Sequence, residues 1–136
     1  GMLSDELIEQ LGAENLANAT FTTSASDSTT PSFAAWKAIA EPADVPISDP
    51  FVPNSYDATF MLALAIEHAG SDDRAGIASS LRSIASAPGE VIHPGEWAKA
   101  KAILAGGGDI NYEGAAGNHD FDENGDDADW GSSDHQ

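Results

Sequence analysis

The sequence predicts a helix-rich α/β chain with few short strands that forms part of a larger fold. Helical signals recur at residues 4–11, 31–40, 54–70, 71–86 and 94–105. Strand signals are confined to residues 18–24, 110–112 and 119–121. A complete α/β domain normally offers several apolar strands at regular intervals. We therefore expect this chain either to belong to a larger fold or to self-associate.

The segment at residues 54–70 is the core helix around which the other elements are organised. Residues 58–66 contain one polar side chain, Thr59, and are rich in alanine, leucine and methionine, which favour a helix. The end signals are Asn54 or Ser55 as N-cap and Gly70 after the last turn. Apolar side chains at positions 60, 61, 62, 64 and 66 point to several sides. We therefore expect this helix to be covered nearly all round.

The other helices are predicted from the residues at their ends. Ser4, Thr30 and residues 71–73 stand where N-cap residues are expected. The glycines at 106–108 follow a helix and lack the Lys-Ser/Thr of a phosphate loop, so we interpret them as a helix stop. The four prolines within residues 41–53 predict an extended, helix-free connection into the core helix.

The charge balance excludes several classes of partner. The 136 residues include 23 acidic and 5 basic ones, which give a formal net charge of −18. Binding to nucleic acid or to an anionic membrane needs clustered lysine and arginine, so both are excluded. The acidity fits cation binding, an acidic interaction surface or adaptation to high salt. Because the acids are spread along the chain, we favour adaptation to salt. The chain has no cysteine, which excludes disulfides and thiolate zinc sites.

No motif predicts catalysis, and we do not expect an enzyme. The histidines at positions 68, 93, 119 and 135 share no metal-ligand spacing and have no evident triad partner. We therefore expect neither a cofactor nor a metal. Asn18 begins an N-glycosylation sequon, a triplet that often arises by chance.

Residues 120–126, with the sequence DFDENGD, match the first half of an EF-hand calcium loop. Asp120, Asp122 and Asn124 stand at ligand positions 1, 3 and 5, and a glycine follows. The twelfth position is Gly131 in place of the usual glutamate, and no helix precedes the motif. Asn-Gly after a short strand is also a strong β-turn signal. We favour a structural turn over a calcium site.

A series of motifs, taken in order along the chain, resembles a known family. The motifs are Tyr56-Asp57-Ala58 at the start of the core helix, Ala69-Gly70-Ser71, a helix with Ile77, Leu81 and Arg82, PGEWAKA at 94–100, DINYEGAAG at 109–117 and DFDENGD at 120–126. Together they resemble the C-terminal part of type I periplasmic binding proteins. These are the extracellular substrate-binding subunits of ABC importers for branched-chain amino acids. The resemblance covers roughly residues 2–127, and its most specific part is residues 110–126.

The resemblance implies two α/β lobes that hold a ligand in the cleft between them, of which this chain supplies the last third. Residues 1–126 would form this partial fold, and residues 127–136 an acidic polar tail. The full-length protein would be exported, extracellular or periplasmic, and would deliver a small amino acid ligand to a membrane permease. We recognise no signal peptide in this chain. For the chain by itself, we expect a homo-oligomer that covers the core helix.

One candidate ligand-binding residue follows from the resemblance, Phe51. An aromatic just before the core helix forms an apolar wall in that family and packs against an aliphatic side chain. A plain core role for Phe51 is an open alternative, and we interpret Tyr56 as a packing residue at the helix start. The alternative function is a free-standing acidic calcium-binding or protein-interaction module.

Overall fold

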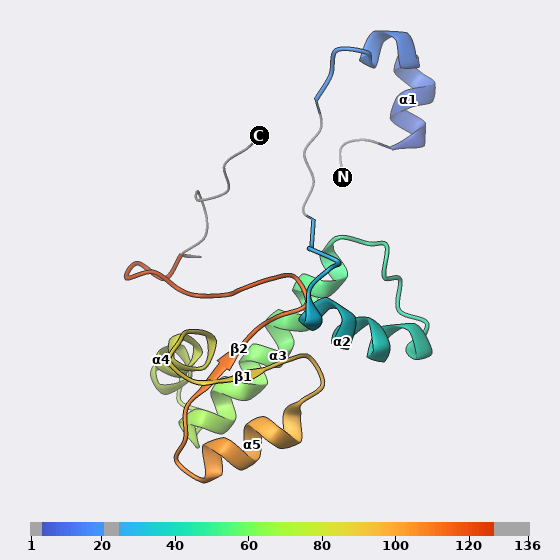
Figure 1. The fold of residues 1–136 in the computed structure, drawn as a ribbon. Helices are drawn as coiled ribbons and strands as arrows, with labels where there is room; N and C mark the ends of the chain where they lie inside the picture. The colour runs from blue at the N-terminus through green and yellow to red at the C-terminus, as the bar shows by residue number, and fades with distance from the viewer. Residues whose placement is uncertain (1–3, 21–24, 127–136) are drawn as a thin grey trace.

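The computed structural model describes residues 4–20 and 25–126. In these residues the helices are α1 (Asp5–Leu11), α2 (Pro31–Ala40), α3 (Phe51–Ala69), α4 (Arg74–Ala85) and α5 (Trp97–Ala105). Two 3-10 helices, η1 (Ala13–Leu16) and η2 (Glu41–Ala43), follow α1 and α2, and the strands are β1 (Glu90–Ile92) and β2 (Ile110–Tyr112). The expectation of a helix-rich α/β chain with few short strands is confirmed (Figure 1).

The two strands form a parallel pair that α5 connects. Glu90 lies opposite Ile110, and Ile92 lies opposite Tyr112. The strand at 110–112 was predicted, whereas β1 was not, because three residues after a proline-glycine turn are too few to show an alternating pattern. Lys99 of α5 reaches back to β1, where its Nζ donates to the carbonyl oxygen of Val91 at 2.8 Å.

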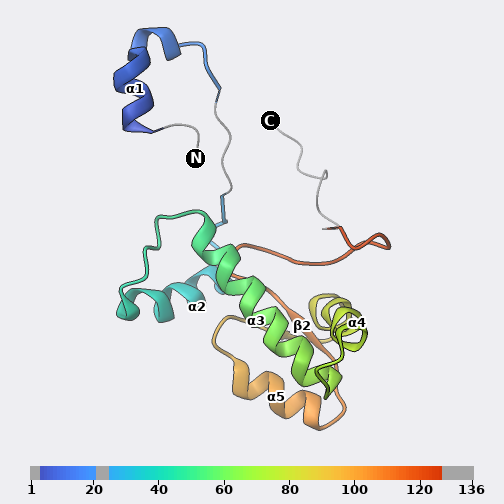
Figure 2. The ribbon, with the colours of Figure 1, turned by 180° about the vertical axis from the view of Figure 1, so that it is seen from behind.

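The main core lies where α3, α4 and α5 meet the strands. Figures 1 and 2 show α3 running along the strand pair, with α4 and α5 at its two sides. Nine buried side chains form this core: Met61, Leu64, Ala65, Ile84, Ala85, Ile92, Ala100, Ile110 and Tyr112. Every one of these elements contributes at least one of them, so the β1–α5–β2 unit and the α3–α4 pair share one apolar interior.

A second, smaller core lies under α2. Trp36 and Ala40 of α2 are buried against Ala115, and Val52 and Tyr56 of α3 pack on them. Phe33, one turn before Trp36 in α2, packs on the same cluster. α1 and η1 stand apart from the remaining elements in both views (Figures 1 and 2).

The predicted helix caps are confirmed at α1, α2 and α4. The side chains of Ser4, Thr30 and Asp73 accept hydrogen bonds from the backbone N–H groups of Leu7, Phe33 and Gly76, respectively. Each side chain satisfies an N–H group that has no partner within its helix. The glycine stop after α5 is also confirmed, because the N–H group of Gly106 bonds to the last carbonyls of that helix.

The predicted start of the core helix is wrong by one turn. α3 begins at Phe51, and Pro53 lies in its first turn, where the missing N–H group costs nothing. Asn54 is not an N-cap, because its side chain donates to the carbonyl of Pro50 at 3.0 Å. The carboxylate of Asp49 instead accepts the N–H of Phe51 at 2.9 Å. The connection before α3 also contains η2, so it is not free of helix as predicted.

α3 is buried along one side rather than all round. Asp57, Met61 and Leu64 are buried, at a spacing that places them on one face. Leu62 and Ile66, on another side, are 46% and 43% exposed. The prediction of full cover is therefore wrong for this chain, because the elements that pack on α3 reach only one of its sides.

Two predicted strands are not observed in the described residues. Residues 18–20 form a turn and an irregular segment, and residues 21–24 lie outside the description. Near residues 119–121 isolated bridge residues stand in place of a strand: an antiparallel bridge joins Glu113 and Asn118, and Phe121 is a further bridge residue. The predicted acidic tail at 127–136 also lies outside the description. Among the described helices, none combines the length and apolar character needed to cross a membrane.

Candidate functional site

The best-defined polar site is built around the carboxylate of Asp57, which is buried in α3. Its Oδ1 accepts the hydroxyl of Tyr112 at 2.7 Å and the N–H of Ala115 at 2.9 Å. Its Oδ2 accepts the N–H of Ala116 at 2.7 Å and lies 3.0 Å from Nε2 of His119. Four donor groups therefore surround a carboxylate whose residue has no exposed surface. Such a set satisfies a buried anion.

The donors to Asp57 come from one short segment that begins at the end of β2. Tyr112 ends the strand, and the segment then turns so that the N–H of Gly114 bonds to the carbonyl of Gly117 at 2.9 Å. Gly114 is needed at this point because a Cβ atom there would collide with both the Asp57 carboxylate and the His119 ring. The hydrogen bonds of the Asp57 carboxylate thus hold residues 112–119 against the second turn of α3.

Electrostatics keeps the Tyr112 hydroxyl in its donating form. Burial raises the pKa of Tyr112 well above its ordinary value, and the neighbouring charge of Asp57 raises it further. The hydroxyl therefore stays protonated and donates to the carboxylate. Because Asp57 is enclosed by protein groups, its role is to position the segment after β2. The sequence placed this aspartate in the first turn of the core helix, where acidic residues are common, so its burial was missed.

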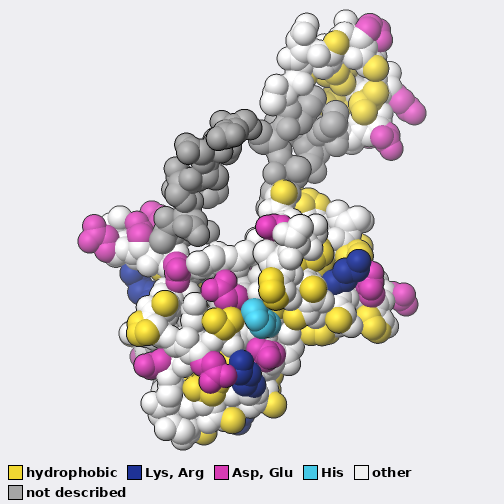
Figure 3. All heavy atoms as spheres, viewed as in Figure 1, with side chains coloured by type: hydrophobic (Ala, Val, Ile, Leu, Met, Phe, Trp, Pro, Cys, Tyr) yellow, Lys and Arg dark blue, Asp and Glu magenta, His cyan; other side chains and the backbone are white. Residues whose placement is uncertain are grey.

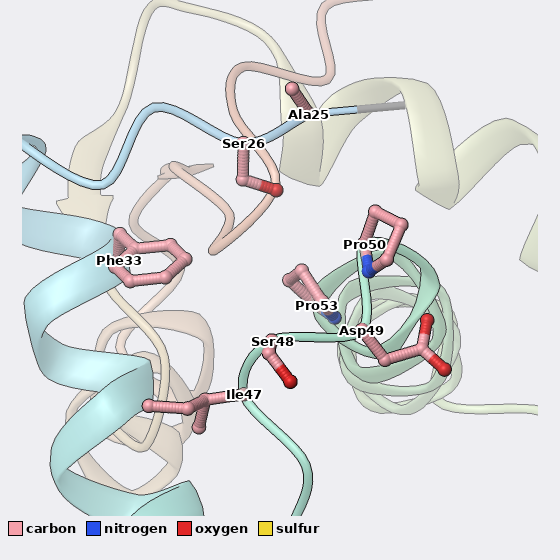
Figure 4. A pocket seen from close by; sticks show the side chains of 8 residues that line it. All are labelled: Ala25, Ser26, Phe33, Ile47, Ser48, Asp49, Pro50 and Pro53. Atoms are coloured by element: carbon pink, nitrogen blue, oxygen red, sulfur yellow. The ribbon is translucent and has the colours of Figure 1, made fainter. Parts of the chain in front are cut away.

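Phe51, the predicted ligand-binding residue, lies at the start of α3 with 56% of its surface exposed. It therefore does not serve as a core residue in this chain. A pocket of about 330 Å³ opens between α2 and the segment that leads into α3; Pro50, which precedes Phe51 in the chain, lines it, whereas Phe51 does not. Figure 4 shows its lining, which is Ala25, Ser26, Phe33, Ile47, Ser48, Asp49, Pro50 and Pro53.

The pocket beside Phe51 is apolar with one inward polar group. The Phe33 ring, Pro50 and Pro53 point into it, while the Asp49 carboxylate points away (Figure 4). The Ser26 hydroxyl oxygen is buried at the pocket and has no hydrogen-bond partner among the described residues. An apolar wall with one hydroxyl suits an aliphatic group better than a charged one.

Tyr56 connects α3 to the loop between β1 and α5. Its hydroxyl accepts the N–H of Gly95 at 3.0 Å, and its ring stacks on Phe60 with centroids 5.6 Å apart. Burial raises the pKa of Tyr56 above its ordinary value. In the same loop, Nδ1 of His93 lies 2.9 Å from the hydroxyl of Ser32. Tyr56 is thus a packing residue, although it lies in the second turn of α3 rather than at the helix start where it was predicted.

The calcium-like motif forms a turn that is closed internally by its second carboxylate, that of Asp122. Oδ1 of Asp122 accepts the N–H groups of Asn124, Gly125 and Asp126 at 2.8 to 2.9 Å. The carbonyl of Asp122 accepts Nη1 of Arg82 on α4, at 2.9 Å. The structural turn is confirmed. Within the described residues, no group of three or more acidic or histidine side chains is arranged to hold a metal ion.

The comparisons with known proteins identify the class to which this fold and site belong. Residues 5–129 match the ANF receptor family, described as a receptor family ligand binding region, which is of the type I periplasmic binding protein kind. Because this match spans most of the chain, the chain belongs to that family. The expected family is thereby confirmed, and it is a family of ligand-binding rather than catalytic proteins.

One curated protein provides a more specific likeness. The chain is 32% identical over 72 residues to the chemotactic signal transduction system substrate-binding protein BasB of Halobacterium salinarum. The alignment covers 53% of this chain and 17% of that relative, so the chain matches only a small part of its length. The comparison with solved structures found no match.

We predict that replacing Asp57 with alanine strongly destabilises the chain. The change leaves the Tyr112 hydroxyl and two buried N–H groups without an acceptor, which costs about 3–5 kcal/mol of unfolding free energy. Chemical denaturation measures this loss, and Asp57→Asn should lose less because one acceptor oxygen is retained. The exposed Asp72→Ala is a matched control, for which we expect a change within about 0.5 kcal/mol. Equal losses for Asp57→Ala and the control would contradict the positioning role.

We also predict that the turn at residues 122–126 loosens in acid. Hydrogen bonds from the Asp126 backbone and from Asn124 and Gly125 lower the pKa of Asp122 below its ordinary value. The stabilisation is therefore complete above that ordinary value of about 4 and is lost as the pH falls through the lower folded pKa. The protection of the Gly125 amide against exchange, measured by NMR relative to the intrinsic exchange rate at each pH, should fall over this range.

An Asp122→Asn variant should abolish the acid dependence of this turn, whereas Asp72→Asn should leave it unchanged. Protection of Gly125 that persists in acid would show that the Asp122 carboxylate does not close the turn.

Calcium should bind this turn no tighter than about millimolar, since the glutamate at the twelfth position of the motif is missing.

Proposed function

We propose that this chain is part of the extracellular substrate-binding subunit of an ABC importer for branched-chain amino acids or related small solutes. The observation that carries the proposal is the family match, which spans residues 5–129. The relative from Halobacterium salinarum is named a substrate-binding protein, which supports the same class of function. The full-length protein would be exported and would pass its ligand to a membrane permease.

Adaptation to high salt is part of the proposal. The acidic side chains that give the formal net charge of −18 repel one another in dilute buffer, and dissolved salt screens that repulsion. The described ion pairs of lysine, such as Lys37 with Glu41, are largely exposed and leave most of the acids unpaired. The organism of the relative named above, Halobacterium salinarum, fits this explanation.

Phe51 would form part of the wall that receives the ligand's aliphatic side chain. The residue is more than half exposed, and its neighbour in the chain, Pro50, lines an apolar pocket. An amino acid also carries two charges, which need paired donors and acceptors when they leave water. The charged Asp49 points away from that pocket (Figure 4), and Asp57 is already satisfied by this chain's own groups. Other parts of the receptor would therefore hold the charged end of the ligand.

The exposed side of α3 would be covered when the rest of the receptor fold, or a second copy, packs on it. Leu62 and Ile66 lie one turn apart, and each leaves close to half of its surface exposed. Burial of apolar surface contributes about 25 cal/mol per Å², so leaving this row in water is unfavourable. For the 136-residue chain alone, a two-fold dimer is the simplest cover.

We predict that the 136-residue chain alone shows no measurable binding to leucine, isoleucine or valine in titration calorimetry. A chimera in which residues 5–129 replace the corresponding part of the Halobacterium relative should bind one of them and should melt at a higher temperature in its presence. In this chimera, Phe51→Ala should weaken binding about tenfold through lost apolar contact. Val91→Ala is a control of comparable exposure at a distant strand.

Two outcomes would contradict different parts of this proposal. Micromolar binding by the 136-residue chain would show that its ligand site is complete. A folded chimera that responds to none of the three amino acids would overturn the assignment to branched-chain amino acids.

We predict further that the 136-residue chain is a dimer or a higher oligomer in solution. Light scattering measures its mass, and Leu62→Glu should produce a monomer because it places a charge within the exposed row of α3. Ile39→Glu, on α2 and of similar exposure, is the control and should leave the oligomer intact. A monomeric parent chain would contradict self-association through α3.

A further inference from the structure

A second pocket, distinct from the one beside Phe51, lies between α2 and the first turns of α3. We call it the α2–α3 groove. Its volume is about 400 Å³, and its lining is Trp36, Ile39, Ala40, Ala43, Val45, Val52, Ser55 and Tyr56. None of these residues lines the pocket beside Phe51. The two hollows therefore offer separate places for a ligand or a partner.

The walls of the α2–α3 groove are held in place before anything binds. Trp36 is 1% exposed, and its ring lies 5.2 Å from that of Phe33. Tyr56 is fixed by the N–H of Gly95 and by stacking on Phe60. A preformed apolar groove binds with a smaller loss of conformational freedom than one that must first be ordered.

The α2–α3 groove has almost no polar group to offer a small charged ligand. The Ser55 hydroxyl donates to the carbonyl of Phe51 at 2.9 Å. The Tyr56 hydroxyl is engaged by Gly95. A free amino acid would leave both of its charges without partners there, which is unfavourable. A single apolar side chain carried by a larger partner fits the groove better, since its polar backbone can stay outside.

The rim of the α2–α3 groove is charged, and its excess charge is negative. Glu41 and Asp44 stand on either side of the lining residue Ala43 in the chain, and both are exposed. Lys37 pairs with Glu41 at 3.5 Å, whereas Asp44, which stands between the lining residues Ala43 and Val45 in the chain, is in none of the described ion pairs. Figure 3 shows acidic, basic and apolar side chains gathered together over α2 and the turn after it, at the right of the view. The net charge of the chain has the same sign.

We propose that the α2–α3 groove is a docking site for a basic protein segment that inserts one large apolar side chain. The apolar side chain would pack between Trp36, Ile39 and Val52, and a lysine or arginine beside it would contact Asp44. The Debye length falls to roughly 3 Å at 1 M salt, so this exposed charge contact is weaker in concentrated salt than in dilute buffer. The site takes a partner protein, so it goes beyond the binding of a small solute proposed above.

The test uses the 136-residue chain and a labelled peptide of two lysines, one phenylalanine and two lysines, with fluorescence anisotropy as the readout. The control peptide carries serine in place of phenylalanine and should bind about tenfold more weakly. Ile39→Asp should also weaken binding of the phenylalanine peptide about tenfold, because it places a charge in the groove. Leu11→Asp, at a similarly exposed position on α1, should leave binding unchanged. Asp44→Asn keeps a residue type that tolerates the positive φ of 55° and removes the rim charge, so it should reduce affinity.

Three outcomes would overturn the proposal. Equal binding of the two peptides would show that the chain attracts lysine without using the groove. Equal effects of Ile39→Asp and Leu11→Asp would place the peptide elsewhere. An oligomer that Ile39→Asp dissociates would assign the groove to a second copy of this chain rather than to a basic partner.

Discussion

The buried carboxylate of Asp57 is the interaction on which the arrangement of the other elements depends. A charge without exposed surface is stable only when donors surround it, and four donor groups from residues 112–119 do so here. This requirement fixes where the end of β2 lies relative to α3. It also brings Ala115 against α2, where it completes the smaller core with Trp36. One polar contact thus links both apolar clusters.

The two apolar clusters differ in how many helices and strands build them. The main cluster joins α3, α4, α5 and both strands, and each of the three helices packs on two other elements of the cluster. The smaller cluster is held by α2 and the first turns of α3, with the hollows of both pockets beside it. Two of the described pockets lie at the smaller cluster, and a third lies between the end of α3 and the turn after α5. Phe51, which precedes Val52 of the smaller cluster in the chain, stays exposed.

Much of the fold was predictable from the sequence because its signals are local. Ser4, Thr30 and Asp73 cap helices through N–H groups three residues away, and a three-residue distance is visible in a sequence. The start of α3 was predicted too late because Pro53, read as a helix breaker, lies in the first turn, where proline is tolerated. β1 escaped notice because its partner lies 20 positions further along the chain.

The candidate site was less predictable because its contacts join distant positions. The hydrogen bonds of Asp57 span 55 to 62 residues, and that from Arg82 to Asp122 spans 40. The local sequence around an acidic residue near the start of a helix does not show whether its carboxylate is buried and hydrogen-bonded or exposed to solvent. Phe51 was predicted as a site residue from the family resemblance alone. No sequence pattern within residues 41–53 predicts that this residue is exposed. Composition, by contrast, predicted the acidic character directly, since a net charge needs no fold.

The contact between Lys99 and Val91 protects one edge of the small sheet. In a parallel pair, alternate residues of a strand turn both of their backbone groups toward the partner, and Glu90 and Ile92 do so here. Val91 consequently presents its carbonyl to the opposite, outer edge of β1, where the Lys99 ammonium already occupies it. A lysine at a strand edge discourages the addition of another strand. The outer edge of β1 is therefore protected against a further strand, although Glu90 and Val91 are exposed in that strand.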